Sequence, residues 1–150
     1  MAVTMAPSTE AMQAIVARIN SGEAYCLDVV ATYSEQIVDV MEEITELRVD
    51  VVDDEETQLQ DTLDIENRTS HAMAVWVRKK VCSLSNDEID PLKLLVRQLF
   101  QRLNNYDSAD GRVRVWEIDQ DSKQCPNKRI LNEQRLFVSP IYLRVEVGAS

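Results

Sequence analysis

The sequence predicts an α+β domain: about five strands in a mixed or antiparallel sheet, with helices packed on one face and long loops between strands. Short apolar stretches alternate between the two-residue period of strands and the 3.6-residue period of helices. These stretches follow one another in the order α-β-α-β-β-α-β-β, without an internal repeat. The chain has 150 residues, 45% of them hydrophobic, which fits a single domain over residues 1–150 with its own core.

The first third of the chain alternates between the two periods. Residues 9–20 place apolar side chains at i, i+3, i+4 and i+7, which predicts a helix with one buried face. Residues 25–33 are apolar at every second position and predict a strand. Ser34 is a suitable N-cap for a short second helix over 35–44, and residues 47–51 again alternate as a strand does.

The middle of the chain changes character after that strand. Residues 53–69 are polar, with isolated apolar positions, and predict a long loop. Residues 71–81 are rich in Val and Trp and predict a strand. Its last side chains, Arg78, Lys79 and Lys80, are expected to lead into solvent.

The last third predicts one helix and two strands. An Asp-Pro pair opens the helix over 91–103, whose apolar face runs for three turns. Residues 112–118 alternate strictly and predict a strand, and the polar stretch 119–135 predicts a second long loop. Residues 137–147 predict the last strand, in which Pro140 indicates an edge position or a bulge.

The net charge of −10 is unevenly distributed along the chain. Residues 1–67 hold two basic and sixteen acidic residues, a net charge of −14, whereas residues 68–150 hold fourteen basic and ten acidic residues, a net charge of +4. A self-assembling protein can use such a split to set an acidic surface against a basic one on the neighbouring subunit. An uneven surface charge without further consequence is the simpler alternative. A chain of this net charge is not expected to bind DNA through a general basic patch.

Several classes of function lack their sequence signals. Cys26, Cys82 and Cys125 are widely spaced and form no CxxC pair, so neither a zinc site nor a redox motif is predicted. His71 is the single histidine and has no nucleophile signature beside it. Glycine-rich phosphate loops, a secretory signal and an apolar run of about 18–20 residues are absent from the sequence. We therefore predict no cofactor, no membrane segment and no catalytic residue.

The acidic stretch 53–66 is the one part of the sequence that invites a metal interpretation. Calcium loops need regularly spaced carboxylates with a glycine at the turn, and this stretch has neither. Two-metal nucleases hold their carboxylates on rigid strand ends, whereas these lie in a predicted loop. A solvated loop or a subunit contact is the favoured interpretation, and no metal site is predicted.

The order and pattern of these elements resemble the tail-terminator (tail-completion) proteins of long-tailed bacteriophages, the family to which the U protein of phage lambda belongs. The resemblance covers roughly residues 8–148 and is one of pattern and element order. The matching segments are TEAMQAIVARIN, LRVDVVDDEE, HAMAVWVRKKV, DPLKLLVRQLFQRL, RVRVWEID and LFVSPIYLRVEV.

The resemblance implies a structural virion protein without catalytic activity. Such a protein forms a ring, expected to be a homohexamer, at the head-proximal end of the tail tube, where it ends tube polymerisation. Its expected partners are copies of itself, the tail-tube protein and the head-side connector, and genomic DNA passes through its lumen without specific binding. Its expected location is the tail or neck of the virion, after assembly in the cytoplasm of the host bacterium. The two long predicted loops resemble segments of the family that become ordered on assembly.

Charged residues in and beside the two predicted loops are the candidate contacts with the next subunit or with the tube. These candidates are Asp53, Asp54, Glu55, Glu56, Arg78, Lys79, Lys80, Lys123, Lys128 and Arg129. Three alternatives stay open: another phage neck protein, such as a head-completion or connector component; a metal-dependent hydrolase that uses the 53–66 carboxylates; and a cytosolic regulatory adaptor with an acidic docking loop.

Overall fold

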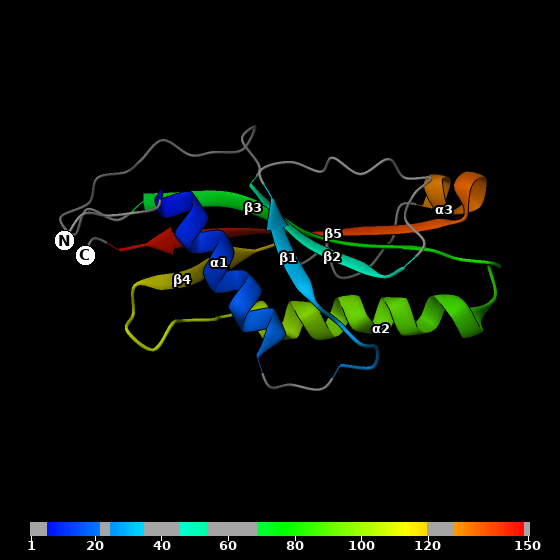
Figure 1. Cartoon of the computed structure of the whole chain (residues 1–150), viewed down its shortest axis with the longest axis horizontal. Helices are drawn as coiled ribbons and strands as arrows, with labels where there is room; N and C mark the ends of the chain where they lie inside the picture. Colours follow the sequence, from blue (N-terminus) through cyan, green and yellow to red (C-terminus); the bar gives the residue numbers. More distant parts are fainter. Residues whose placement is uncertain (1–5, 22–24, 35–45, 54–68, 120–127, 149–150) are drawn as a thin grey trace.

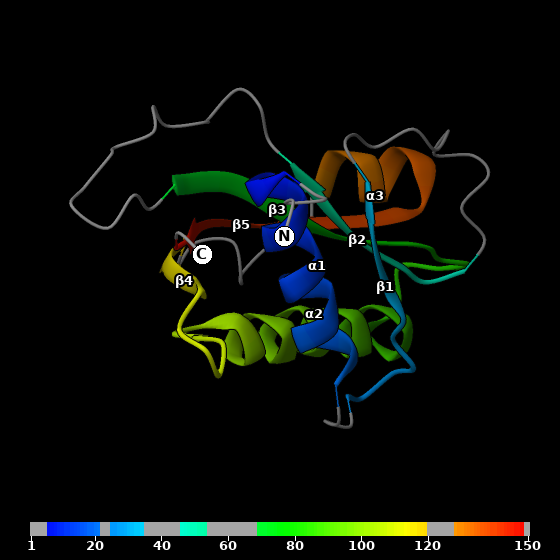
Figure 2. The same ribbon diagram turned by 60° about the vertical axis from the view of Figure 1, so that its left-hand side comes forward.

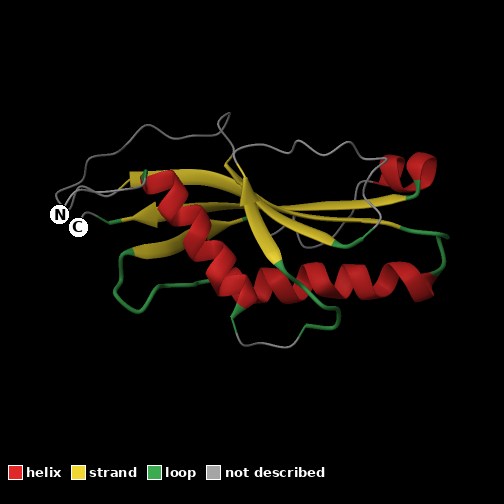
Figure 3. Cartoon of the chain, viewed as in Figure 1, coloured by secondary structure: helices red, strands yellow, loops and turns green. Residues whose placement is uncertain are grey.

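Five strands and three helices make up the computed structural model of the chain, which describes residues 6–21, 25–34, 46–53, 69–119 and 128–148 (Figure 1). The sheet has the strand order β1-β2-β3-β5-β4. The bounds are α1 Pro7–Asn20, β1 Ala31–Ser34, β2 Arg48–Asp53, β3 Thr69–Lys80, α2 Asn86–Leu103, β4 Val113–Ile118, α3 Lys128–Gln134 and β5 Leu136–Val147. Figure 3 shows the same arrangement by type of element. None of the described helices is long and apolar enough to cross a membrane.

The sheet is mixed, as the sequence predicts. β1 runs parallel to β2, and the other three pairs of neighbouring strands are antiparallel. The longest pairing joins β3 and β5 over twelve residues each, from Thr69 opposite Val147 to Lys80 opposite Leu136. The predicted α+β fold is therefore confirmed, with β3 and β5 as its framework.

The main core lies between the sheet and the two long helices, α1 and α2 (Figure 2). Every second residue of a strand faces it, as the strand period requires, for example Val49 and Val51 of β2. α2 contributes seven buried residues at helical spacing: Ile89, Leu92, Leu95, Val96, Leu99, Phe100 and Leu103. The apolar faces predicted from spacing are thus the faces that pack.

α2 begins at Asn86, five residues before the predicted start at Pro91. Pro91 lies inside the helix, in its second turn, where it cannot donate the backbone hydrogen bond that another residue would make there. The earlier start buries Ile89, which extends the apolar face by one turn. A side-chain oxygen of Glu88 accepts a hydrogen bond from the backbone N–H of Cys82 at 2.7 Å, which holds the chain entering the helix.

The predicted strand over 25–33 is wrong in its first part, because only Ala31–Ser34 forms β1. The preceding residues are attached to α2 instead. The Gln98 side chain accepts a hydrogen bond from the Cys26 backbone N–H at 2.9 Å, and the Cys26 thiol donates to the Pro91 carbonyl. Their alternating apolar side chains still pack against the core, which explains the strand-like pattern without a strand.

The second predicted loop, 119–135, contains a helix, α3. Its Ile130 packs with Trp76, Leu136 and Val138 on the face of the sheet opposite α2. Figures 1 and 2 show α3 and α2 on opposite sides of the sheet. The expectation that all helices share one face therefore holds for α1 and α2 and is wrong for α3.

Pro140 lies in β5, which is an interior strand of the sheet. At Pro140 itself, however, β5 has a strand neighbour on one side only, as the predicted edge position requires. β4 pairs with β5 only from Leu143 to Val147, so β5 has β3 alone as a strand neighbour at Pro140. The missing N–H of proline is tolerated where one side of a strand has no partner strand. The predicted helix 35–44 and most of the predicted loop 53–69 lie outside the described residues.

Candidate functional site

Basic side chains gather at one end of the sheet, where β3 ends and β5 begins. Lys79 and Lys80 close β3, and Lys80 lies opposite Leu136 at the start of β5. The backbone N–H of Val81 donates to the carbonyl of Arg135 at 2.8 Å, so the α3–β5 connection lies beside the end of β3. We call this surface the basic end; its residues are Arg48, Lys79, Lys80, Lys128, Arg129 and Arg135.

α3 brings two of these cations to the basic end. Ile130 and Leu131 anchor the helix through apolar contacts, and Lys128 and Arg129 are exposed. Arg129 is 83% exposed and forms an i,i+4 pair with Glu133 at 3.5 Å. Two candidates far apart in sequence, the Lys79–Lys80 pair and the Lys128–Arg129 pair, thus reach the same end of the molecule (Figure 1).

Arg78 does not lead into solvent, and that prediction is wrong. Its side chain is only 3% exposed, and its guanidinium donates to a carboxylate oxygen of Asp50 at 2.6 Å. Thr32 donates to the other oxygen of Asp50 at 2.9 Å, and Arg48 lies 3.9 Å from that same oxygen. The strand register is the reason: Arg78 lies opposite Arg48, two positions along β2 from Asp50, so Arg78 and the Asp50 carboxylate are neighbours on the same face of the sheet.

Arg48 and Arg135 also belong to the basic end, although no pattern in the sequence marks them as candidates. Arg48 lies opposite Arg78 in the β2–β3 register and is 43% exposed. Arg135 is exposed and has a positive φ of 54°, which turns the chain from α3 into β5. Strand register brings Arg48 to this end, and an isolated arginine in a strand carries no sequence signal of that placement.

The acidic candidate Asp53 lies at the opposite end of β2 from the basic end. It is opposite Met73, five positions along β2 from Arg48, and is 7% exposed. At about 3.4 Å per residue, five positions separate the two by roughly 17 Å. The other acidic candidates, Asp54, Glu55 and Glu56, and the basic candidate Lys123 lie outside the described residues.

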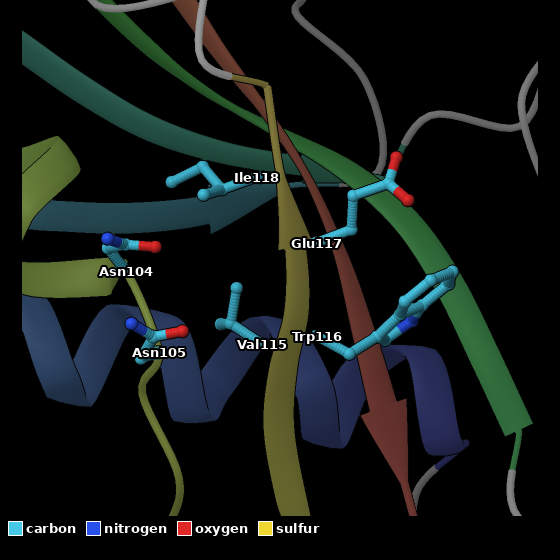
Figure 4. A pocket seen from close by; sticks show the side chains of 6 residues that line it. All are labelled: Asn104, Asn105, Val115, Trp116, Glu117 and Ile118. Carbon is cyan, nitrogen blue, oxygen red and sulfur yellow. The ribbon is translucent and has the colours of Figure 1, made fainter.

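A shallow groove of about 280 Å³ lies beside the edge strand β4 (Figure 4). Asn104 and Asn105, which follow α2, form one wall, and the chain from Val115 to Ile118 forms the other.

The β4–β5 register shifts between Val115 and Glu117, so Trp116 sits in a β-bulge. Its indole N–H donates to the Ser70 hydroxyl at 3.1 Å. Glu117 is the one ionisable residue that lines the groove, and it forms an ion pair with Arg144 at 3.5 Å. The lining therefore offers no second ionisable group with which Glu117 could exchange a proton during catalysis.

The described part of the chain contains no group of three His, Cys, Asp or Glu side chains that could hold a metal ion. Cys26 and Cys82 are free thiols. Burial raises the pKa of the Cys26 thiol, whose hydrogen points at the Pro91 carbonyl, so it is a poorer nucleophile than an ordinary cysteine. Charge, rather than a reactive group, distinguishes the site at the basic end.

No protein-family model and no curated protein sequence matches the chain. Function is therefore inferred from the chain's own geometry and charge.

Proposed function

We propose that the protein is a structural, non-catalytic component of a phage tail that forms a ring at the head-proximal end of the tail tube. The ring stops tube polymerisation, joins the tail to the head-side connector and leaves a lumen for DNA. The proposal places the protein in the virion, with copies of itself, the tube protein and the connector as partners. Its basis is the order of the elements together with the distribution of charge over the fold.

The separation of charge along the strands is the observation that carries this proposal. The basic end lies at one end of β2 and β3, and the buried Asp53, with which the acidic run 53–56 of the sequence begins, lies at the other. A subunit whose two ends differ in charge favours head-to-tail contacts, in which one surface meets a different surface of the next copy. Contacts of that kind close into a ring when a whole number of the repeated rotations completes one turn without a rise along the axis, and otherwise they form an open filament.

Electron microscopy of the purified protein, alone and with a tail-tube protein, tests this function. We expect rings in the first sample and, in the second, tubes of limited length with one ring at an end. An unchanged distribution of tube lengths contradicts the proposal. Rings that bind the head-side connector and ignore tubes indicate another neck protein instead.

A further inference from the structure

The outer edge of β4 is paired with other main chain along its first half only. Residues 106–108 lie against it there and form an isolated antiparallel bridge. Within this contact, the Val115 N–H donates to the Tyr106 carbonyl at 2.9 Å. β4 is the last strand of the sheet, so its second half, residues 116–118, has no strand on its outer side within the described part of the chain.

Three main-chain groups of β4 point to this outer side and have no hydrogen-bond partner among the described residues. In a strand, the N–H and the carbonyl of one residue point to the same side, and successive residues alternate. The Val115 N–H points outward to Tyr106, so the Val115 carbonyl does the same. Beyond the β-bulge, the Asp119 N–H donates inward to the Tyr142 carbonyl at 2.9 Å. The N–H and the carbonyl of Ile118 therefore point outward.

These three groups lie in a part of the edge that is nearly closed to water. Val115 is 4% exposed and Ile118 is 8% exposed, and both line the groove beside β4. Buried main-chain donors and acceptors are almost always hydrogen-bonded, because leaving one without a partner costs free energy. The groove of about 280 Å³ exceeds the roughly 30 Å³ that one water molecule takes up in the liquid, so it has room for a chain segment.

We propose that the groove beside β4 binds a short, extended, non-acidic segment of a partner protein, which adds to the sheet as a strand. The main chain of such a segment supplies the two donors and the acceptor that Val115 and Ile118 require, and main-chain hydrogen bonds give this mode of binding its affinity. The carboxamides of Asn104 and Asn105 form the opposite wall, and each can both donate and accept (Figure 4). The inference goes beyond the proposed ring and does not depend on it.

The charge of the groove disfavours nucleic acid and acidic segments as its occupant. Glu117 is the one ionisable residue of the lining and is 57% exposed, whereas its ion-pair partner Arg144 is 28% exposed. The groove therefore presents negative charge to solvent, which repels phosphate and carboxylate groups.

The sheet of a second copy is a poorer occupant, because both of its edges are obstructed. The Asn20 amide is bonded to both the N–H and the carbonyl of Ala31 on the outer side of β1. Residues 106–108 cover the first half of β4. A short segment of another protein meets neither obstruction.

The test selects ligands for the full chain from a displayed library of random short linear peptides. N104F places an aromatic ring in the lining of the groove, and Q101F places the same ring about one turn earlier on α2, outside the lining. Both positions are exposed, and circular dichroism checks that both variants fold. Fluorescence anisotropy measures the affinity of the selected peptides, and of a labelled DNA duplex, for the three proteins.

We expect selection to enrich peptides that bind wild type and Q101F equally and N104F about tenfold or more weakly. Binding should also slow hydrogen exchange at the Ile118 amide, because its N–H gains an acceptor. N-methylation of the peptide should abolish binding at the residues whose N–H faces β4 and leave it unchanged at the residues between them, since a strand alternates.

Four results overturn the inference. A selection that enriches no peptide leaves the groove to water, and equal binding by N104F and Q101F places the peptide elsewhere. A DNA duplex that binds wild type and Q101F but not N104F assigns the groove to nucleic acid. Light scattering that shows self-association of wild type and Q101F, and its loss in N104F, assigns the groove to a second copy.

Discussion

At the scale of single residues, Asp50 and Arg78 place an ion pair within the sheet. Their side chains are 8% and 3% exposed, and Thr32 from β1 donates to the same carboxylate. Three neighbouring strands therefore meet at one acidic side chain. A buried ion pair of this kind adds little net stability compared with apolar side chains of similar size. The loss of one partner is costly, however, because the other charge then stays buried without compensation.

We therefore expect R78A to lower the free energy of unfolding by about 3–5 kcal/mol. The double variant D50L/R78M, which removes both charges, should be less destabilised than R78A. Urea unfolding measures both. R114A is the control, because Arg114 is 50% exposed in its pair with Glu146 and its removal should cost less than about 1 kcal/mol. An R78A variant as stable as R114A contradicts the assigned burial.

Asp110 gives a second residue-scale prediction, concerning pH. The Ser108 hydroxyl donates to its carboxylate at 2.7 Å and the Arg112 backbone N–H at 3.0 Å. These hydrogen bonds hold the pKa of Asp110 below its ordinary value of 3.8. Because the folded pKa is lowered, the stabilisation is complete above that ordinary value and is lost as pH falls through the folded pKa.

Carboxyl NMR titration of wild type and S108A measures this pKa directly. S108A removes the stronger of the two hydrogen bonds, so the pKa of Asp110 should rise towards 3.8. An unchanged titration of Asp110 in S108A shows that the hydroxyl contributes nothing.

At the scale of elements, β1 depends on a side chain of α1. The Asn20 amide donates to the Ala31 carbonyl at 3.1 Å and accepts from the Ala31 N–H at 2.8 Å. One side-chain amide thus replaces a neighbouring strand on the outer side of β1. Four-residue β1, with β2 as its one strand partner among the described residues, gains a fixed position from this contact.

Hydrogen exchange at the Ala31 amide tests this role of Asn20. N20A leaves that N–H without its acceptor, so its exchange should accelerate about five- to twelvefold, the factor that corresponds to a lost hydrogen bond of roughly 1–1.5 kcal/mol. N20D keeps an acceptor but loses the donor, and should give an intermediate rate. The Val51 amide, inside β2, is the reference and should stay protected. Equal rates in all three proteins contradict the assignment.

The elements that the sequence predicts well are those whose own periodicity coincides with their burial. α1, α2, β3 and β5 bury the residues that their spacing selects. The errors arise where contacts from elsewhere decide. Residues 25–30 alternate as a strand does but are attached to α2 by Gln98 and Pro91. α3 has only seven residues and two anchoring apolar side chains, too few for a period to be recognised in a polar stretch.

At the scale of the whole molecule, the basic end exists only because strand register joins distant segments. The sequence identifies Lys79, Lys80, Lys128 and Arg129 as candidates, but it cannot tell Arg78 from its neighbours. Arg78 and Lys80 share one face of β3, but Arg78 lies beside the Asp50 carboxylate of β2, whereas Lys80 lies beyond the end of the β2–β3 pairing and is exposed. The separation of the basic end from Asp53 likewise follows from their positions at opposite ends of β2.

A heterologous contact between unlike surfaces predicts that two defective variants complement each other. K79E/K80E/K128E/R129E leaves the basic end with two basic and four acidic side chains, and D54K/E55K/E56K leaves the acidic run 53–56 with three basic side chains and one acidic. Each variant alone presents two surfaces of like charge to its own copies and should remain monomeric at low salt. In an equal mixture, each variant finds the opposite charge on the other at both of its surfaces, so alternating assemblies of an even number of copies should form.

Light scattering of the mixture, and native mass spectrometry of one isotopically labelled variant, measure both the mass and the alternation. A 1:1 mixture of wild type and K79E/K80E/K128E/R129E is the control; it should not yield strictly alternating assemblies, because wild-type copies also pair among themselves. In an isologous contact the same surface of both copies meets. A charge reversal on that surface could then not be rescued by a second variant that carries its reversal on a different surface. A mixture of the two variants that remains monomeric contradicts the pairing of the basic end with residues 54–56.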